Sequence, residues 1–121
     1  MKKILVILLL SVMTISCQSQ SNPKVKIIAP DAFKTAISKG EVQLVDVRTS
    51  EEFSEGAIAH ALNINVNGAD FETEIQKLDK TQPVYIYCRS GARSQTAAKK
   101  MVDFGFTEVI DLEGGYLNWK Q

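Results

Sequence analysis

The sequence has 121 residues, enough for one domain and too few for two. Hydrophobic residues make up 45% of it, and 14 Lys and Arg are balanced by 14 Asp and Glu, which excludes a highly charged, disordered chain. We find no basic stripe interleaved with aromatic residues, so we expect no nucleic acid partner.

The N-terminal residues have the pattern of an export signal. Lys2 and Lys3 precede an apolar run at 4–12 that is too short to span a membrane as a stable helix. The four residues that follow at 14–17 resemble a lipobox, the recognition site of bacterial lipoprotein processing, because small Ser16 precedes Cys17. Thr14 stands where an aliphatic residue is usual, and the alternative is an ordinary secretory signal with a cysteine at its end by chance.

This pattern divides the chain into three parts. We expect residues 1–16 to be a signal peptide, residues 17–24 a polar tether lipidated at Cys17, and residues 25–121 the folded domain. The expected location is a membrane-anchored lipoprotein facing the periplasm or the cell exterior. Lipidation turns the sulfur of Cys17 into a thioether, which leaves Cys88 as a lone thiol, and a lone thiol in an exported protein suggests reactivity.

The remaining chain alternates short apolar runs with helical patterns. The apolar runs predict strands at 25–28, 42–47, 61–66, 84–87 and 109–112. Helical spacing predicts helices at 30–39, 50–55, 70–78 and 94–104, followed by a Gly-Gly turn and a short tail. Thr49 and Glu52 have the spacing of a capping box, and Gly56 ends the helix that they begin. The alternation predicts an α/β sandwich with a mostly parallel five-stranded sheet and helices on both faces.

The candidate site follows Tyr87, at the end of a predicted buried strand. Ligands of parallel sheets bind at the carboxyl ends of strands, and a tight turn into a helix presents backbone N–H groups to an anion. These amides, the helix dipole and two arginines favour the reactive thiolate of the cysteine. Glycine gives the loop its backbone freedom, and the serines are able to donate to a bound group or cap the helix. The segment reads Cys88-Arg89-Ser90-Gly91-Ala92-Arg93-Ser94.

This segment resembles the active-site loop of the rhodanese family of sulfurtransferases. The resemblance extends over nearly the whole chain from Lys26 to Trp119 and rests on three further segments in the family's order. These are Asp46-Val47-Arg48 with Glu52-Phe53, then Gly56 through Asn63, and Gly114-Gly115 with Trp119. The sequence departs from the family at Ala57, where histidine is common, and at His60, where a small residue is usual.

The resemblance implies a double displacement without a cofactor. A donor such as thiosulfate or a persulfide gives sulfane sulfur to Cys88, and a thiol, a protein cysteine or cyanide removes it. In this scheme Arg93 positions the anionic donor and holds the loop, whereas Arg89 points outward and attracts anions. We expect a monomer, anchored to a membrane through its lipid.

Two further residues are expected to support the loop from behind. Asp46 and Arg48 are interpreted as residues of a structural salt link near the loop rather than as a catalytic pair, with Asp46 orienting the loop and Arg48 expected to pair with Glu52. One histidine, His60, and one cysteine do not make a zinc site, so no metal is expected.

Two other functions stay open at this point. Cysteine phosphatases and arsenate reductases are built on the same fold, but their loop is one residue longer than the six residues from Cys88 to Arg93. The second alternative is a persulfide carrier or binding module that delivers sulfur to one partner with little turnover.

Overall fold

The computed structural model describes residues 22–119. Its five strands form one sheet in the order β1-β5-β4-β2-β3, and every pairing is parallel. The strands are β1 (Val25–Ile28), β2 (Gln43–Asp46), β3 (Leu62–Asn63), β4 (Val84–Tyr87) and β5 (Val109–Leu112). The helices are α1 (Pro30–Ile37), α2 (Ser50–Glu55), α3 (Phe71–Ile75), α4 (Ala92–Asp103) and α5 (Gly115–Trp119).

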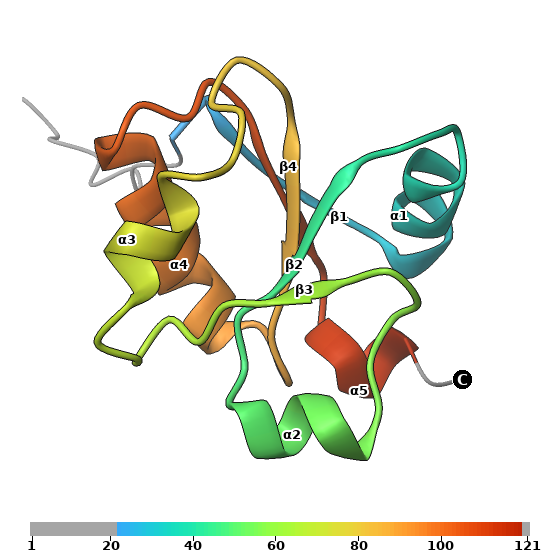
Figure 1. The fold of residues 1–121 in the computed structure, drawn as a ribbon. Coiled ribbons are helices and arrows are strands. Elements are labelled where there is room, and N and C mark those ends of the chain that lie inside the picture. Colours follow the sequence, from blue (N-terminus) through green and yellow to red (C-terminus); the bar gives the residue numbers. More distant parts are fainter. Residues whose placement is uncertain (1–21, 120–121) are drawn as a thin grey trace, which may run out of the picture.

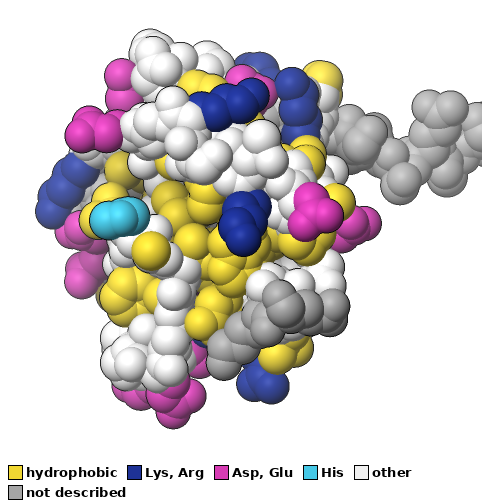
Figure 2. Space-filling view, turned by 90° about the vertical axis from the view of Figure 1, so that its right-hand side faces the viewer, with side chains coloured by type: hydrophobic (Ala, Val, Ile, Leu, Met, Phe, Trp, Pro, Cys, Tyr) yellow, Lys and Arg dark blue, Asp and Glu magenta, His cyan; other side chains and the backbone are white. Residues whose placement is uncertain are grey.

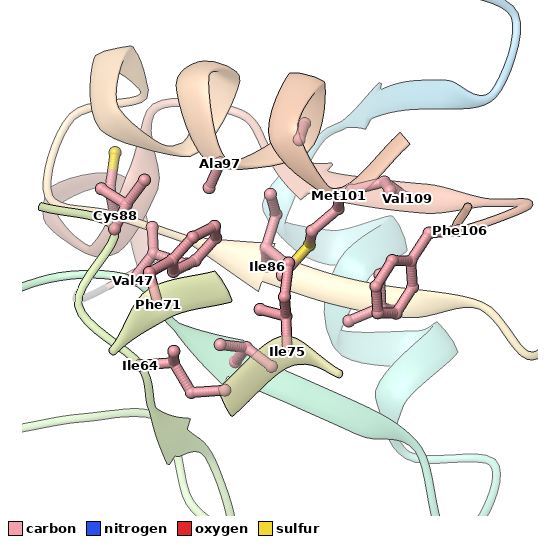
Figure 3. Packing of buried hydrophobic residues seen from close by; sticks show 14 residues of the cluster. Val47, Ile64, Phe71, Ile75, Ile86, Cys88, Ala97, Met101, Phe106 and Val109 are labelled. Carbon is pink, nitrogen blue, oxygen red and sulfur yellow. The ribbon is translucent and has the colours of Figure 1, made fainter. Parts of the chain in front are cut away.

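Helices cover both faces of the sheet, as predicted (Figure 1). α3 and α4 lie on one face and α1 on the other, while α2 and α5 lie near the ends where β2 and β4 finish (Figure 1). Each face has its own apolar core. The larger core packs α3 and α4 against the sheet, and Cys88 and Phe106 lie at its opposite ends (Figure 3). The smaller core joins Phe33 of α1 to Tyr87, with Trp119 packed at its edge.

Most predicted elements are confirmed, with the largest differences at the edge of the sheet and the end of the chain. The predicted strand at 61–66 pairs only at Leu62–Asn63. Beyond it, the amides of Ile64 and Val66 still donate to the backbone carbonyls of Asp46 and Val47, so the chain follows β2 without regular pairing. The predicted helix at 94–104 begins two residues earlier, at Ala92.

The residues after Gly114 form the short helix α5 rather than a tail. Gly114 and Gly115 both have positive φ, 74° and 65°, a region that favours glycine. The predicted glycine turn is therefore present, and it leads directly into a helix.

The capping box that starts α2 is confirmed. The Thr49 hydroxyl accepts a hydrogen bond from the Glu52 amide, and the Glu52 carboxylate accepts one from the Thr49 amide. These bonds satisfy two N–H groups that a helix start leaves without partners. They also fix the Glu52 side chain in position at the start of α2.

The predicted signal peptide and Cys17 lie outside the described residues. Of the predicted tether, only residues 22–24 are described, where the chain makes a turn closed by the Val25 amide donating to the Asn22 carbonyl at 3.0 Å. Within residues 22–119, no helix is both long enough and apolar enough to cross a membrane.

Candidate functional site

Cys88 lies directly after β4, at the start of the loop that leads into α4. Cys88 is only 1% exposed, and its sulfur accepts a hydrogen bond from the Gly91 amide at 3.0 Å. Gly91 has a φ of 113°, which places it in the left-handed region and turns its N–H back toward the sulfur. The loop therefore bends around the sulfur atom and aims a backbone donor at it.

The outer side of the loop is held by α5. The amides of Tyr116 and Leu117 donate to the carbonyls of Cys88 and Arg89, at 2.8 and 3.1 Å. Gly115 permits this approach, because a Cβ there would lie 2.5 Å from the backbone carbon and oxygen of Arg89. The prediction that the Gly-Gly turn brings the chain close to the loop is confirmed.

An ion pair joins the end of the loop to α2. Arg93 donates to both carboxylate oxygens of Glu52, at 2.7 and 2.9 Å. The prediction that Glu52 pairs with Arg48 is wrong, because the capping box directs the Glu52 carboxylate toward the loop. The hydrogen bonds from Arg93 lower the pKa of Glu52 to about 2, with burial opposing and Thr49 assisting.

Arg93 also interacts electrostatically with the cysteine. Its pKa is raised first by the hydrogen bonds to Glu52, against the opposing effect of burial, and then by the charges of Glu52 and Cys88. A thiolate at Cys88 thus interacts favourably with the Arg93 cation. Because the guanidinium already binds a carboxylate, its main role in this arrangement is to hold the loop.

Behind the loop, Asp46 and Arg48 form a buried salt link with each other, so Arg48 pairs with Asp46 instead of Glu52. The Arg48 guanidinium donates to Asp46 Oδ1 at 3.0 Å, to Asp46 Oδ2 at 2.6 Å and to the Gly56 carbonyl at 2.6 Å. Burial lowers the pKa of Arg48, but the hydrogen bond and charge of Asp46 more than offset this, and the pKa is raised.

The same guanidinium stacks on the helix that holds the loop. It lies 4.4 Å from the centre of the Tyr116 ring, which is within the range of a cation–π contact. Because the Tyr116 amide binds the Cys88 carbonyl, the salt link supports the loop through α5. Tyr116 was not identified from the sequence, although its position after Gly114-Gly115 was a usable signal.

The remaining loop residues separate into exposed and buried positions. Arg89, Ser90 and Ala92 are exposed, so the prediction that Arg89 points outward is confirmed. Ser94 is fully buried; its hydroxyl donates to the Gly91 carbonyl at 3.1 Å and lies 3.4 Å from the Cys88 sulfur. Ser94 therefore contacts the cysteine rather than serving as the helix cap, a position that Gly91 occupies.

A shallow hollow of about 180 Å³ lies beside the loop. Two of its charged side chains are already paired, because Glu52 forms an ion pair with Arg93 and Arg48 forms one with Asp46. An exposed cation, Arg89, and an exposed carboxylate, Glu55, remain at its rim. The lining residues are Arg48, Glu52, Glu55, Gly56, Arg89, Tyr116 and Leu117.

A buried carboxylate next to the loop was missed in the sequence. Asp111 of β5 is 1% exposed, and burial raises its pKa to about 6, with a hydrogen bond to Ser94 opposing. A carboxylate inside an otherwise apolar strand was the signal that could have identified it.

The two departures from the family pattern do not adjoin the sulfur. Ala57 is half-buried beside Ile58, whose amide donates to the Tyr87 hydroxyl at 3.0 Å. His60 is exposed on the α1 side of the molecule, at the edge of a face where hydrophobic side chains lie between charged ones (Figure 2). It borders a different hollow, formed with Ile37 and Leu44. Within residues 22–119, no three His, Cys, Asp or Glu side chains are grouped so that they could hold a metal ion.

Known proteins resemble this chain over most of its length. A family model described as the rhodanese-like domain matches residues 29–121. The chain is 37% identical over 84 residues to a thiosulfate sulfurtransferase named GlpE from Coxiella burnetii, covering 69% of this chain and 77% of that protein. It is 35% identical over 98 residues to the putative sulfurtransferase YtwF of Bacillus subtilis, and the match covers 80% of this chain and 92% of that protein.

Solved structures agree with these matches. The crystal structure of a rhodanese-like domain protein from Staphylococcus aureus superposes with a TM-score of 0.71 at 30% identity, covering 79% of this chain and 92% of that one. With its parallel sheet and its cysteine loop at the end of β4, the chain belongs to the rhodanese-like domain family and is a relative of sulfurtransferases.

Proposed function

We propose that the protein is a sulfurtransferase that receives sulfane sulfur on Cys88 and passes it to a nucleophilic acceptor. The observation that supports this most strongly is the geometry at the sulfur. Cys88 is a buried thiol in the loop between β4 and α4, and its sulfur accepts a hydrogen bond from the Gly91 amide at 3.0 Å. The Arg93 cation interacts favourably with the charge of Cys88. A backbone N–H and a nearby cation stabilise negative charge on sulfur, and the thiolate is the nucleophilic form.

The proposed reaction has two displacements. The Cys88 thiolate attacks the outer sulfur of thiosulfate or of a persulfide, a new S–S bond forms, and the old S–S bond breaks. Its electron pair leaves with sulfite or with the donor's thiolate. A thiol, a protein cysteine or cyanide then attacks the terminal sulfur of the Cys88 persulfide, and the Cys88 thiolate leaves. No electrons are gained or lost overall, so no cofactor is required.

The surroundings of the loop suggest what each charged group does in this reaction. Arg93 and Arg48 already bind carboxylates, so their roles are to hold the loop and to contribute a positive field. Arg89 is the exposed cation of the rim and is the group best placed to attract an anionic donor. Glu55 on the same rim disfavours a donor of high negative charge, so a thiol persulfide should compete well with thiosulfate.

The fold also supports phosphate chemistry in other proteins, so the test compares both reactions. Sulfur transfer to cyanide or to a thiol and hydrolysis of an aryl phosphate are measured on one preparation, with Cys88→Ser as the blank. A phosphoryl group left with two unpaired oxygens in this short loop would lose about 1–3 kcal/mol for each, which slows the reaction roughly a hundredfold or more. We expect sulfur transfer and almost no phosphate release. Cys88-dependent phosphate release without sulfur transfer would overturn the proposal.

We also propose that the domain is exported and held at a membrane by lipid on Cys17, facing the periplasm or the cell exterior. The support is the lipobox-like pattern at residues 14–17. The several chains of a bacterial lipoprotein anchor firmly, whereas a single chain binds only marginally. Cys17→Ala should move the protein from the membrane fraction to the soluble fraction, and equal partitioning of both forms would contradict the anchor.

A further inference from the structure

The hollow beside the cysteine loop carries two exposed charges of opposite sign. Arg89 follows Cys88 in the loop, and Glu55 is the last residue of α2; both side chains line the hollow. Among the residues that the structure describes, neither side chain forms an ion pair or a side-chain hydrogen bond with a neighbour. One cation and one carboxylate are therefore available to a ligand in the same hollow.

The other charged side chains of the hollow are held by partners within the fold. Glu52 accepts two hydrogen bonds from Arg93, at 2.7 and 2.9 Å. Arg48 is bound to the buried Asp46 carboxylate and stacks on the Tyr116 ring. Opening the Arg48 pair for a ligand would leave a buried charge without compensation, which is strongly unfavourable. Recognition of charge in this hollow therefore depends on Arg89 and Glu55.

The position of Glu55 in its helix also favours a bound cation. The C-terminal end of a helix carries partial negative charge on its backbone carbonyls, and basic side chains are the usual complement there. The last turn of α2 contains no basic residue and ends in a carboxylate instead. A cationic group beside Glu55 therefore gains from the side chain and from the end of the helix together.

The size and the lining of the hollow limit the ligand further. Its volume of about 180 Å³ is below the roughly 300–1,000 Å³ of pockets that enclose drug-sized ligands, so it suits a molecule of only several heavy atoms. Leu117, which is 52% exposed, and the Tyr116 ring give it an apolar wall between the charges of the rim. The amides of these two residues bind the carbonyls of Arg89 and Cys88, so the wall adjoins the loop that carries the sulfur.

We propose that this hollow binds a zwitterionic α-amino acid thiol, cysteine or its persulfide, with the carboxylate at Arg89 and the ammonium group at Glu55. This deepens the proposed function, on which the transfer step rests. The Cys88 thiolate attacks the outer sulfur of cysteine persulfide, a new S–S bond forms, and the electron pair of the old S–S bond leaves with the cysteine thiolate. Thiosulfate is attracted by Arg89 but repelled by Glu55, because it carries two negative charges and no cation.

The test measures binding of three related thioethers by NMR titration at pH 7, followed at the amide signals of Gly56 and Leu117, which line the hollow. S-methylcysteine carries both charged groups, methylthiopropionate lacks the ammonium group, and methylthioethylamine lacks the carboxylate. Ion pairs at exposed sites are weak, so each charged group should contribute about two- to fivefold in affinity. For the wild type we therefore expect S-methylcysteine to bind about two- to fivefold more tightly than either of the other compounds.

Two variants assign each preference to its residue. Glu55→Gln should abolish the preference for S-methylcysteine over methylthiopropionate and keep the preference over methylthioethylamine, and Arg89→Gln should do the reverse. A general loss of structure would not produce this crossed pattern. Glu51→Gln and Lys99→Gln, exposed on α2 and α4 but outside the hollow, are the matched controls and should keep both preferences. Equal binding of the three compounds to the wild type, or preferences that both variants retain, would overturn the proposal.

The binding site and the proposed function fail separately in these experiments. The three thioethers contain no S–S bond and transfer no sulfur, so the titrations report the hollow alone. The crossed pattern in a protein whose Cys88 takes up no sulfur from cysteine persulfide would support the site and remove the sulfurtransferase proposal. Sulfur transfer by a protein in which S-methylcysteine leaves the Gly56 and Leu117 signals unchanged would do the opposite.

Discussion

Arg93 and Glu52 are joined by two hydrogen bonds of 2.7 and 2.9 Å, which tie the end of the cysteine loop to the start of α2. The Glu52 carboxylate that receives them also completes the capping box with Thr49. One carboxylate therefore fixes a helix start and a loop end together, so the loop geometry depends on the local structure of α2.

Breaking this pair should weaken both stability and sulfur transfer. Glu52→Gln keeps the shape of the side chain but removes the charge, and we expect a loss of about 1–3 kcal/mol in the free energy of unfolding. The rate of sulfur transfer should fall because the loop end is released. Glu51→Gln, in the same turn but exposed, is the control and should change neither quantity by much. Denaturant unfolding and the sulfur-transfer assay on both variants check this. Equal stability and equal sulfur-transfer rates of the two variants would contradict a role for the Arg93–Glu52 pair in holding the loop.

The same pair predicts how acid affects stability. The pKa of Glu52 is lowered from 4.5 to about 2, so the folded state binds fewer protons than the unfolded state between these values. The contribution of the pair is complete above about pH 4.5 and is lost as the pH falls toward 2. Unfolding measured from pH 6 to 2 should show this loss in the wild type and a flatter curve in Glu52→Gln. Parallel curves would show that the carboxylate titrates normally.

The buried Asp111 carboxylate should change the stability with pH in the opposite direction. Its pKa is raised from 3.8 to about 6, so the folded state binds more protons in this window, and stability falls as the pH rises through it. Asp111→Asn removes the buried charge and should be more stable than the wild type above pH 6, by about 1–3 kcal/mol, with the difference shrinking toward pH 4. Thermal unfolding at pH 8 and pH 4 checks this. A variant less stable than the wild type at pH 8 would contradict it.

Gly115 predicts a steric effect on the loop. In Gly115→Ala the new Cβ would lie 2.5 Å from the Arg89 backbone, so the chain must shift and the bonds from Tyr116 and Leu117 to the loop carbonyls must weaken. We expect a loss of more than about 1 kcal/mol together with slower sulfur transfer. Gly40→Ala is the matched control, because Gly40 also has a positive φ but a Cβ there would have no neighbour within 4 Å. This variant should lose stability without any loss in the rate of sulfur transfer. Full sulfur transfer by Gly115→Ala would show that α5 does not hold the loop.

The sequence patterns were informative wherever a local rule governs the structure. Three elements were placed correctly: the strand before Cys88, the helix capped at Thr49 and the glycine turn near Trp119. Each depends on a local property, namely an apolar run, a capping box or a positive φ, which a few neighbouring residues determine. The length of β3 was overestimated because its apolar residues pack in the core without regular pairing.

The contacts between elements could not be predicted in the same way. Two arginines, Arg48 and Arg93, were available to Glu52, and only the fold brings Arg93 to it while Asp46 takes Arg48. The proximity of Asp111 to Ser94 depends on β5 lying next to β4 beneath α4, which no spacing within β5 reveals.

The most direct measurement of the proposed activity is the mass of the full-length protein after incubation with thiosulfate or with a low-molecular-weight persulfide. The proposal predicts one added sulfur atom, located on the Cys88 peptide, absent from Cys88→Ser, and removed when a thiol acceptor or cyanide is added. An unchanged Cys88 after incubation with both donors, in a protein whose thiol still reacts with an alkylating agent, would contradict the assignment of this protein as a sulfurtransferase.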